Sequence, residues 1–163
     1  MAGMDGKHIA IQKPAHSATV YYNYKQSFSI VLLGLIDANY KFIYADIGCN
    51  GRVSDALETR ALDVPKYKPL PGRQMPVPFV ITADDAFPLK QYIMKPFPFK
   101  NQPAPDNIFN FRLSRARRVV ENVFGLLACR FHILSYTILL QPEKVITVVS
   151  AIVCLHNFLI SRN

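Results

Sequence analysis

The sequence contains few cysteines and no long uninterrupted apolar run, and both shortages exclude classes of protein. Its three cysteines are an odd number without CxxC spacing, which argues against a disulfide framework or a zinc ribbon and favours a reducing compartment. Residues 145–160 are the most apolar stretch, but polar residues interrupt it short of the ~18 positions of a membrane span. The N-terminus lacks the apolar segment of a secretory signal. These features predict a soluble, intracellular protein without a membrane partner.

Acidic residues are also scarce. The chain has eleven of them against nineteen lysines and arginines, which gives a formal net charge of +8. A domain this basic favours a polyanionic partner, with nucleic acid as the leading class. Half of the residues are hydrophobic and 18% are charged, which excludes intrinsic disorder. The 163 residues are sufficient for one domain with a hydrophobic core.

The first half of the chain has the pattern of a β-rich region. Apolar runs predict strands over residues 8–12, 28–36 and 40–47, and the turn residues between the last two predict a hairpin. Ser54 can cap a short helix that follows. Ten of the twelve prolines fall between residues 65 and 105, so this region is expected to be irregular around one short buried strand at 79–83.

The second half has a helical pattern. Apolar residues at helical spacing from Phe109 to Leu127 predict a long helix. Residues 133–140 then read as a strand or extended segment, and Pro142 suits the first position of a final helix. The order of elements predicts an α/β fold, a mixed β-sheet with flanking helices.

Three acids occupy places where carboxylates can converge. We expect Asp5 at the beginning of the first strand, Asp84 at the carboxyl end of the buried strand, and Glu121 at the edge of the long helix's apolar stripe. Converging carboxylates repel unless a cation neutralises them, and hard divalent ions prefer oxygen ligands. Two such ions ~3.5–4 Å apart can activate water and stabilise the leaving oxygen of a phosphodiester. Alternatively, Asp84 is a turn residue and Glu121 forms a solvated ion pair with an arginine one turn earlier.

The densest group of basic residues lies in and after the same helical segment and consists of Arg112, Arg115, Arg117, Arg118 and Arg130. Guanidinium groups bind phosphate oxygens and give salt-dependent affinity for nucleic acid. The alternative is a solvated helix face with stabilising pairs one turn apart. The net charge favours phosphate binding, so these are candidate nucleic-acid-binding residues.

Two further groups have a structural and a functional interpretation. His156 and Asn157 lie near the end of an apolar helix, where a packing or capping role is favoured over catalysis. Three tyrosines beside Lys25, at positions 21, 22 and 24, could stack on bases, although interfacial packing is the commoner role of such a cluster.

Five segments, in order along the chain, carry a resemblance to a known family. They are residues 4–11 (with 21–25 behind them), 48–55, 83–89, 109–125 and 154–157. Together they resemble the PIF/Harbinger transposases, which are DDE-type endonucleases with an RNase H-like core. The resemblance implies that residues 1–163 form a DDE-type nuclease domain that hydrolyses DNA phosphodiesters with a divalent metal, Mg²⁺ or Mn²⁺.

The resemblance also implies roles for particular residues. Asp5, Asp84 and Glu121 match the catalytic and metal-binding triad, and Asp55 matches an additional metal ligand. Asp84, and not Asp85, matches the family's second acid. The implied location is the nucleus, or also the cytoplasm, and a separate Myb-like DNA-binding protein is an implied partner.

One difference from the family leaves an alternative function open. Its members carry a helix-turn-helix region before the first catalytic Asp, whereas four residues precede Asp5 here, so we expect a domain that is truncated at its N-terminus relative to the family. The alternative is a catalytically inactive, domesticated transposase domain that acts as a DNA- or protein-binding module.

Overall fold

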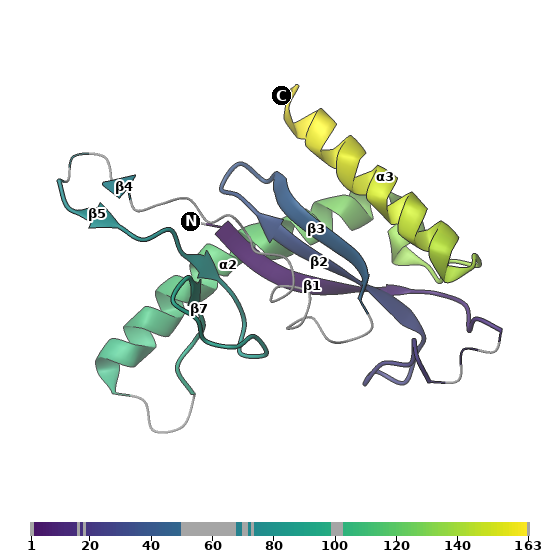
Figure 1. Ribbon diagram of the computed structural model, residues 1–163, viewed down its shortest axis with the longest axis horizontal. Coiled ribbons are helices and arrows are strands. Elements are labelled where there is room, and N and C mark those ends of the chain that lie inside the picture. Colours follow the sequence, from purple (N-terminus) through teal and green to yellow (C-terminus); the bar gives the residue numbers. More distant parts are fainter. Residues whose placement is uncertain are drawn as a thin grey trace.

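A mixed five-stranded sheet forms the centre of the protein (Figure 1). The computed structural model describes residues 2–15, 17, 19–49, 68–69, 72, 74–98 and 103–162. The strand order is β3-β2-β1-β6-β7, with bounds β1 Ala2–Ala10, β2 Ser29–Ile36, β3 Phe42–Cys49, β6 Ile81–Thr82 and β7 Ile93–Met94. A separate two-stranded ladder joins β4 (Lys68–Pro69) to β5 (Pro76–Val77).

The strands combine two modes of pairing. β1, β2 and β3 pair antiparallel in sequence order, whereas β6 runs parallel to β1 and β7 parallel to β6. Strand β2 lies between two partners and all eight of its residues are buried, which explains its near-continuous apolar sequence. In the turn after β2, the Asp37 carboxylate accepts hydrogen bonds from the backbone N–H groups of Asn39 (2.8 Å) and Lys41 (3.0 Å), which closes the hairpin.

Two long helices cover one face of this sheet. Helix α2 (Ala104–Arg130) packs on β1, β2 and β6, and α3 (Pro142–Ile160) packs against β3 (Figure 1). A short 3₁₀ helix, His132–Ser135, connects them. The core on this side joins both helices to the sheet and includes Ile9, Leu32, Val120, Val123, Leu127, Val145 and Val149. A second core cluster forms from other positions of the strands, including Met4, Leu33, Leu35 and Ile81, together with Phe87 from the segment after β6.

The final helix differs in one respect from the sequence expectation. By length and mean hydropathy (1.6), α3 meets the criteria for a helix that could cross a membrane, a test that a core helix can also pass. One side of α3 packs on the sheet through residues such as Val145 and Val149, and 28% of the tested window is buried. Its outer side leaves large apolar side chains exposed, including Leu155 and Phe158.

The predicted α/β class is confirmed, but several boundaries were wrong. The first strand begins at Ala2, so Asp5 lies inside it and not at its beginning. The predicted strand at 79–83 is reduced to Ile81–Thr82. The long helix begins at Ala104, because prolines at its start suit the unpaired first turn. Residues 133–140 begin in the 3₁₀ helix, and the extended part contributes a single bridge between Ile138 and Ile11. Ser54 and its predicted helix lie outside the described residues.

Candidate active site

Strand register places Asp5 and Asp84 at the same level of the sheet. Gly3 of β1 pairs with Thr82 of the parallel strand β6, and each aspartate follows its paired residue by two positions. Because side chains two residues apart point to the same face of a strand, the Asp5 carboxylate emerges on the side of Gly3. This is the side covered by α2, since a Cβ on Gly3 would lie 3.5 Å from Val120. Asp84 lies two residues beyond the end of β6, near enough for its charge to act on Asp5.

Glu121 comes to the same place from α2. Its neighbour Val120 is fully buried against Gly3, which brings the helix close to β1 at this turn, while Glu121 itself is exposed. Burial raises the pKa of the Asp5 carboxyl above its ordinary value of 3.8, the Gly6 N–H and Arg117 act to lower it, and the charges of Asp84 and Glu121 raise it further. The three acids therefore share one electrostatic neighbourhood.

Arg117, one turn before Glu121 on α2, is the cation of this neighbourhood. Its Nη2 lies 3.5 Å from Oδ2 of Asp5, and both side chains are mostly withdrawn from water. The other Asp5 oxygen, Oδ1, accepts a hydrogen bond from the Gly6 N–H at 2.8 Å. Among the described residues, the ion pair of Arg117 is with Asp5 across the helix–sheet interface, and not with Glu121 along the helix.

The two neighbouring aspartates have different surroundings. Oδ1 of Asp84 accepts a hydrogen bond from the Ala86 N–H at 3.0 Å, so the residue does shape the turn after β6, and its side chain is partly exposed. Asp85 points to solvent and pairs with Lys95 at 3.3 Å. Its side chain is 72% exposed, which is typical of a surface ion pair.

The chemistry of the acids fits a divalent cation better than their present arrangement does. Carboxylate oxygens are the ligands that Mg²⁺ and Mn²⁺ prefer, and the charge on Asp5 is only partly compensated by Arg117. Within the part of the chain that the structure describes, however, no three acidic, histidine or cysteine side chains are grouped closely enough to hold one ion. Asp55, the fourth predicted ligand, lies outside that part.

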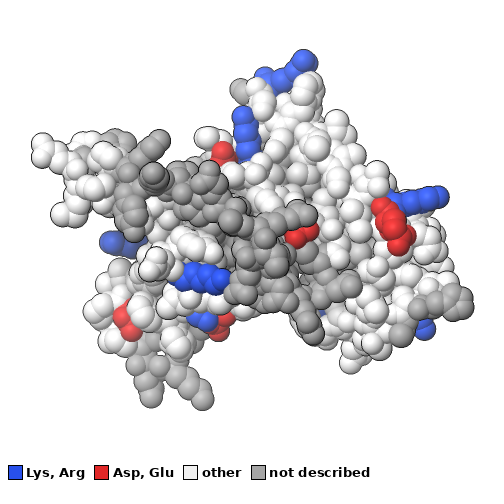
Figure 2. All heavy atoms as spheres, in the orientation of Figure 1, with Lys and Arg blue, Asp and Glu red and all other residues white. Residues whose placement is uncertain are grey.

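The predicted arginine group does not form one surface. Arg112, Arg115 and Arg118 recur every third residue on the exposed side of α2, whereas Arg117 turns toward Asp5. Arg115 also lies over the ring of Phe111, with its guanidinium carbon 6.0 Å from the ring centre. Arg130 ends the helix, roughly 18 Å beyond Arg118 at ~1.5 Å per residue. On the face in Figure 2, basic side chains are interspersed with acidic ones and do not gather in one patch.

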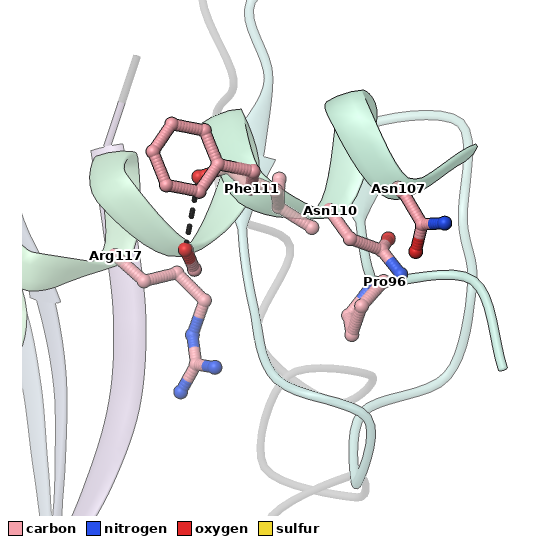
Figure 3. A pocket seen from close by; sticks show the side chains of 7 residues that line it. Pro96, Asn107, Asn110, Phe111 and Arg117 are labelled. Atoms are coloured by element: carbon pink, nitrogen blue, oxygen red, sulfur yellow. Dashed lines mark hydrogen bonds between the residues drawn. The ribbon is translucent and has the colours of Figure 1, made fainter. Parts of the chain in front are cut away.

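A pocket of about 240 Å³ lies beside Arg117, between α2 and the segment that follows β7 (Figure 3). Asn110 holds this segment to the helix: its Oδ1 accepts from the Phe97 N–H at 2.9 Å and its Nδ2 donates to the Phe97 carbonyl at 3.0 Å. Arg117 lies at one end of the pocket and Pro96 at the other. The full lining is Pro96, Asn107, Asn110, Phe111, Leu113, Ser114 and Arg117.

Sequence reasoning missed both the Asp5–Arg117 pair and the pocket. The available signal was the position of Arg117 at the edge of the apolar stripe, one turn before Glu121, together with a polar Asn110 at a core-facing position. Neither position indicates which residue it contacts, Asp5 of the sheet for Arg117 or Phe97 of the loop for Asn110.

The structure also bears on the pair His156 and Asn157 and on the tyrosines beside Lys25. His156 is fully buried and bonds the Tyr40 carbonyl through Nε2 at 2.8 Å, which confirms a packing role. Tyr22 packs edge-on against Phe28, as interfacial packing predicts. Tyr24 is 80% exposed beside Lys25, and stacking on a base there stays a prediction.

The model of one protein family, described as DDE superfamily endonuclease, matches residues 4–157. The chain belongs to this family. Membership confirms the resemblance to the DDE-type endonucleases of the PIF/Harbinger group, and the mixed five-stranded sheet with flanking helices is consistent with their RNase H-like fold. DDE superfamily endonucleases are nucleases that act on DNA and generally use divalent metals.

A comparison with individual curated proteins gives one significant match. It is Protein ALP1-like from Arabidopsis thaliana, 25% identical over 170 residues that cover 96% of this chain and 42% of that protein. The chain thus spans less than half the length of this relative. No solved structure matches significantly.

Proposed function

We propose that this DDE superfamily endonuclease domain is a metal-dependent nuclease core, derived from a transposase, that hydrolyses DNA phosphodiester bonds in the nucleus. The observation that supports the proposal is that Asp84 and Glu121 lie near enough to Asp5 for their charges to act on it. Negative charge concentrated at a partly buried carboxylate is unfavourable by itself, and a bound cation would neutralise it.

In this proposal Asp5, Asp84 and Glu121 hold Mg²⁺ or Mn²⁺, with Asp55 as an additional ligand. Bound ions would supply an activated water and stabilise charge on the leaving oxygen. Asp5 belongs to strand β1 and Glu121 to helix α2, so the backbone positions of these two ligands are set by the packing of the helix on the sheet, and their side chains would turn toward a bound ion. Exposed arginines of α2, Arg112, Arg115 and Arg118, bind the DNA backbone next to the acids, with Arg130 extending the contact.

The test combines cleavage with stability. Supercoiled DNA is incubated with the protein and Mg²⁺ or Mn²⁺, and thermal melts are recorded with metal and a short duplex. We expect nicking, and a stabilisation that reaches about 2.7 kcal/mol when metal is at 100 times its dissociation constant. Asp84→Asn is expected to lose both effects, while Asp85→Asn, which removes only a surface pair, keeps both. Absence of nicking and of any metal effect in the wild type would refute the nuclease.

A specific observation supports a second candidate, the inactive DNA- or protein-binding module. Arg117 already neutralises part of the Asp5 charge, and no ligating group of three is assembled among the described side chains. If this candidate is right, salt-sensitive DNA binding persists, whereas metal changes neither the melting temperature nor the DNA.

We further propose that target choice belongs to a separate Myb-like DNA-binding protein, as the family resemblance implies. Exposed arginines that contact phosphates carry no sequence information directly. Binding to random duplexes of equal length is therefore expected to be uniform for this chain alone. A sequence preference measured in the absence of any partner would contradict this part of the proposal.

A further inference from the structure

The ion pair between Asp5 and Arg117 is loose although it is mostly buried. Its 3.5 Å separation is longer than the ~2.7–2.9 Å of a charge-assisted hydrogen bond. The exposed fractions are 18% for the Arg117 side chain and 22% for Asp5, so water does little to compensate either charge. A pair with this geometry leaves both partners short of interactions and can be exchanged for better ones.

Arg117 lacks an acceptor in particular. Its Nε is buried and has no hydrogen-bond partner among the residues that the structure describes. A buried N–H without an acceptor costs about 1–3 kcal/mol. An anionic oxygen beside the guanidinium would remove this cost and would bond in the forked geometry that arginine prefers.

The pocket beside Arg117 provides room for such an oxygen. Arg117 is the charged member of its lining, and the remaining walls are apolar or neutral (Figure 3). Ser114 donates its hydroxyl to the Phe111 carbonyl at 2.9 Å, and Asn110 is bonded twice to Phe97, so these walls are held in place. The volume of about 240 Å³ is below the ~300–1,000 Å³ of pockets for drug-sized ligands, which suits one phosphate group.

We propose that Arg117 couples DNA binding to metal binding: in the free protein its guanidinium covers Asp5, and a backbone phosphate in the adjacent pocket draws the guanidinium away and leaves Asp5 open to a divalent cation. The inference rests on the proposed function and adds its regulation. The exchange gives each residue the interaction that it lacks in the free protein: the phosphate supplies a hydrogen-bond acceptor for Arg117, and the metal supplies a full counter-charge for Asp5. Arg117 is thus a positioning residue that acts through Asp5.

Coupling of this kind is reciprocal. If DNA strengthens metal binding by a given factor, metal strengthens DNA binding by the same factor, and coupling between two sites typically amounts to about 5–150-fold. A residue with a merely structural role would change stability without changing this ratio.

The experiment measures the dissociation constant of Mn²⁺ by titration, without DNA and with a saturating short duplex. In the wild type we expect DNA to tighten Mn²⁺ binding at least about 5-fold. In Arg117→Met, which keeps the stem of the side chain and removes its charge, Mn²⁺ is expected to bind more tightly than in the wild type without DNA, and the ratio falls to near 1. A second variant, Arg117→Gln, keeps hydrogen-bonding ability if the methionine variant unfolds, and is expected to show the same loss of coupling.

Arg118→Met is the matched control, since it removes an exposed arginine at the next position of the same helix. It is expected to weaken DNA binding but to keep the wild-type ratio once DNA is saturating. A duplex with uncharged methylphosphonate linkages tests the phosphate: it is expected to leave Mn²⁺ affinity unchanged.

The outcomes separate the two proposals. Mn²⁺ binding with an equal DNA effect in the wild type and in both Arg117 variants overturns the coupling and leaves the nuclease proposal standing. Enhancement by the uncharged duplex also overturns it. No Mn²⁺ binding in any sample, with or without DNA, overturns both proposals together.

Discussion

The side-chain amide of Asn157 bonds both backbone polar groups of Phe42: Oδ1 accepts from the N–H at 2.8 Å and Nδ2 donates to the carbonyl at 2.9 Å. These bonds join the end of α3 to the first residue of β3, 115 positions earlier. The preceding His156 bonds Tyr40 and packs edge-on against the Phe42 ring. The two residues together hold the last helix on the edge of the sheet.

Replacing Asn157 is therefore expected to weaken the fold. Asn157→Ala leaves two partly buried backbone groups without partners, which costs about 1–3 kcal/mol for each group that water does not reach. Urea unfolding followed by circular dichroism measures the loss. Asn122→Ala is the control, because Asn122 makes one exposed contact of 3.4 Å with Tyr40, and it should stay within about 0.5 kcal/mol of the wild type.

Alanine substitution is expected to have opposite effects on the free energy of unfolding at two glycines, Gly34 and Gly125. A Cβ at Gly34 would lie 2.8 Å from Cε1 of Phe42, so Gly34→Ala must displace a core ring and is expected to cost about 1–3 kcal/mol. At Gly125, on the exposed side of α2, nothing lies within 4 Å, and Gly125→Ala is expected to stabilise the helix by up to about 1 kcal/mol. The free energies of unfolding from one denaturation series decide both signs.

His8 predicts a loss of stability in acid. Burial lowers the pKa of its imidazole below 6.5, with a smaller contribution from Lys25. The unfolded chain then binds a proton more readily than the folded one, so stability falls as pH drops from about 6.5 through the folded value. His8→Gln should make the pH profile of the melting temperature shallower in this window. The exposed-site variant His132→Gln is expected to follow the wild type.

Asp5 predicts the opposite dependence. Its pKa is raised chiefly by burial, so the protonated form adds stability that is complete below 3.8 and is lost as pH rises through the folded value. At pH 7 without metal, Asp5→Asn is therefore expected to melt at a higher temperature than the wild type, even though Arg117 loses its counter-charge. A lower melting temperature would mean that the ion pair outweighs the cost of burying Asp5.

The exposed arginines of α2 predict a salt effect. Each phosphate contact that is lost should reduce the slope of log K against log salt by about 0.9. Replacing Arg112, Arg115 and Arg118 with alanine is expected to flatten the slope and to lower affinity for all DNA sequences alike. Fluorescence anisotropy over a range of salt concentrations measures both, and an unchanged slope would assign the three side chains to a solvated helix face.

Much of the framework follows from local sequence. The apolar run of β2 indicated a strand buried on both faces, and helical periodicity indicated α2 and α3, because these signals depend on neighbours within one element. Periodicity placed Val145 and Val149 of α3 correctly in the core, but Leu155, expected on the same face, is half exposed. The order of the acids along the chain, with the segments around them, was sufficient to predict the DDE family that the comparison confirmed.

Tertiary structure decided what depends on pairing between distant segments. Glycines at positions 3 and 6 obscured the start of β1, which pairs with β2 from Gly3 to Ala10, so Asp5 lies inside the strand. The parallel register of β6 on β1 decides how far along the sheet Asp84 lies relative to Asp5. The packing of Val120 against Gly3 brings α2 close to β1, and this contact decides that Arg117 pairs with Asp5. The sequence by itself supplied the acids and the arginine and the helix that carries Arg117. The packing of α2 on β1 decided that Arg117 faces Asp5, because an ion pair forms where close packing brings two side chains together and keeps water out.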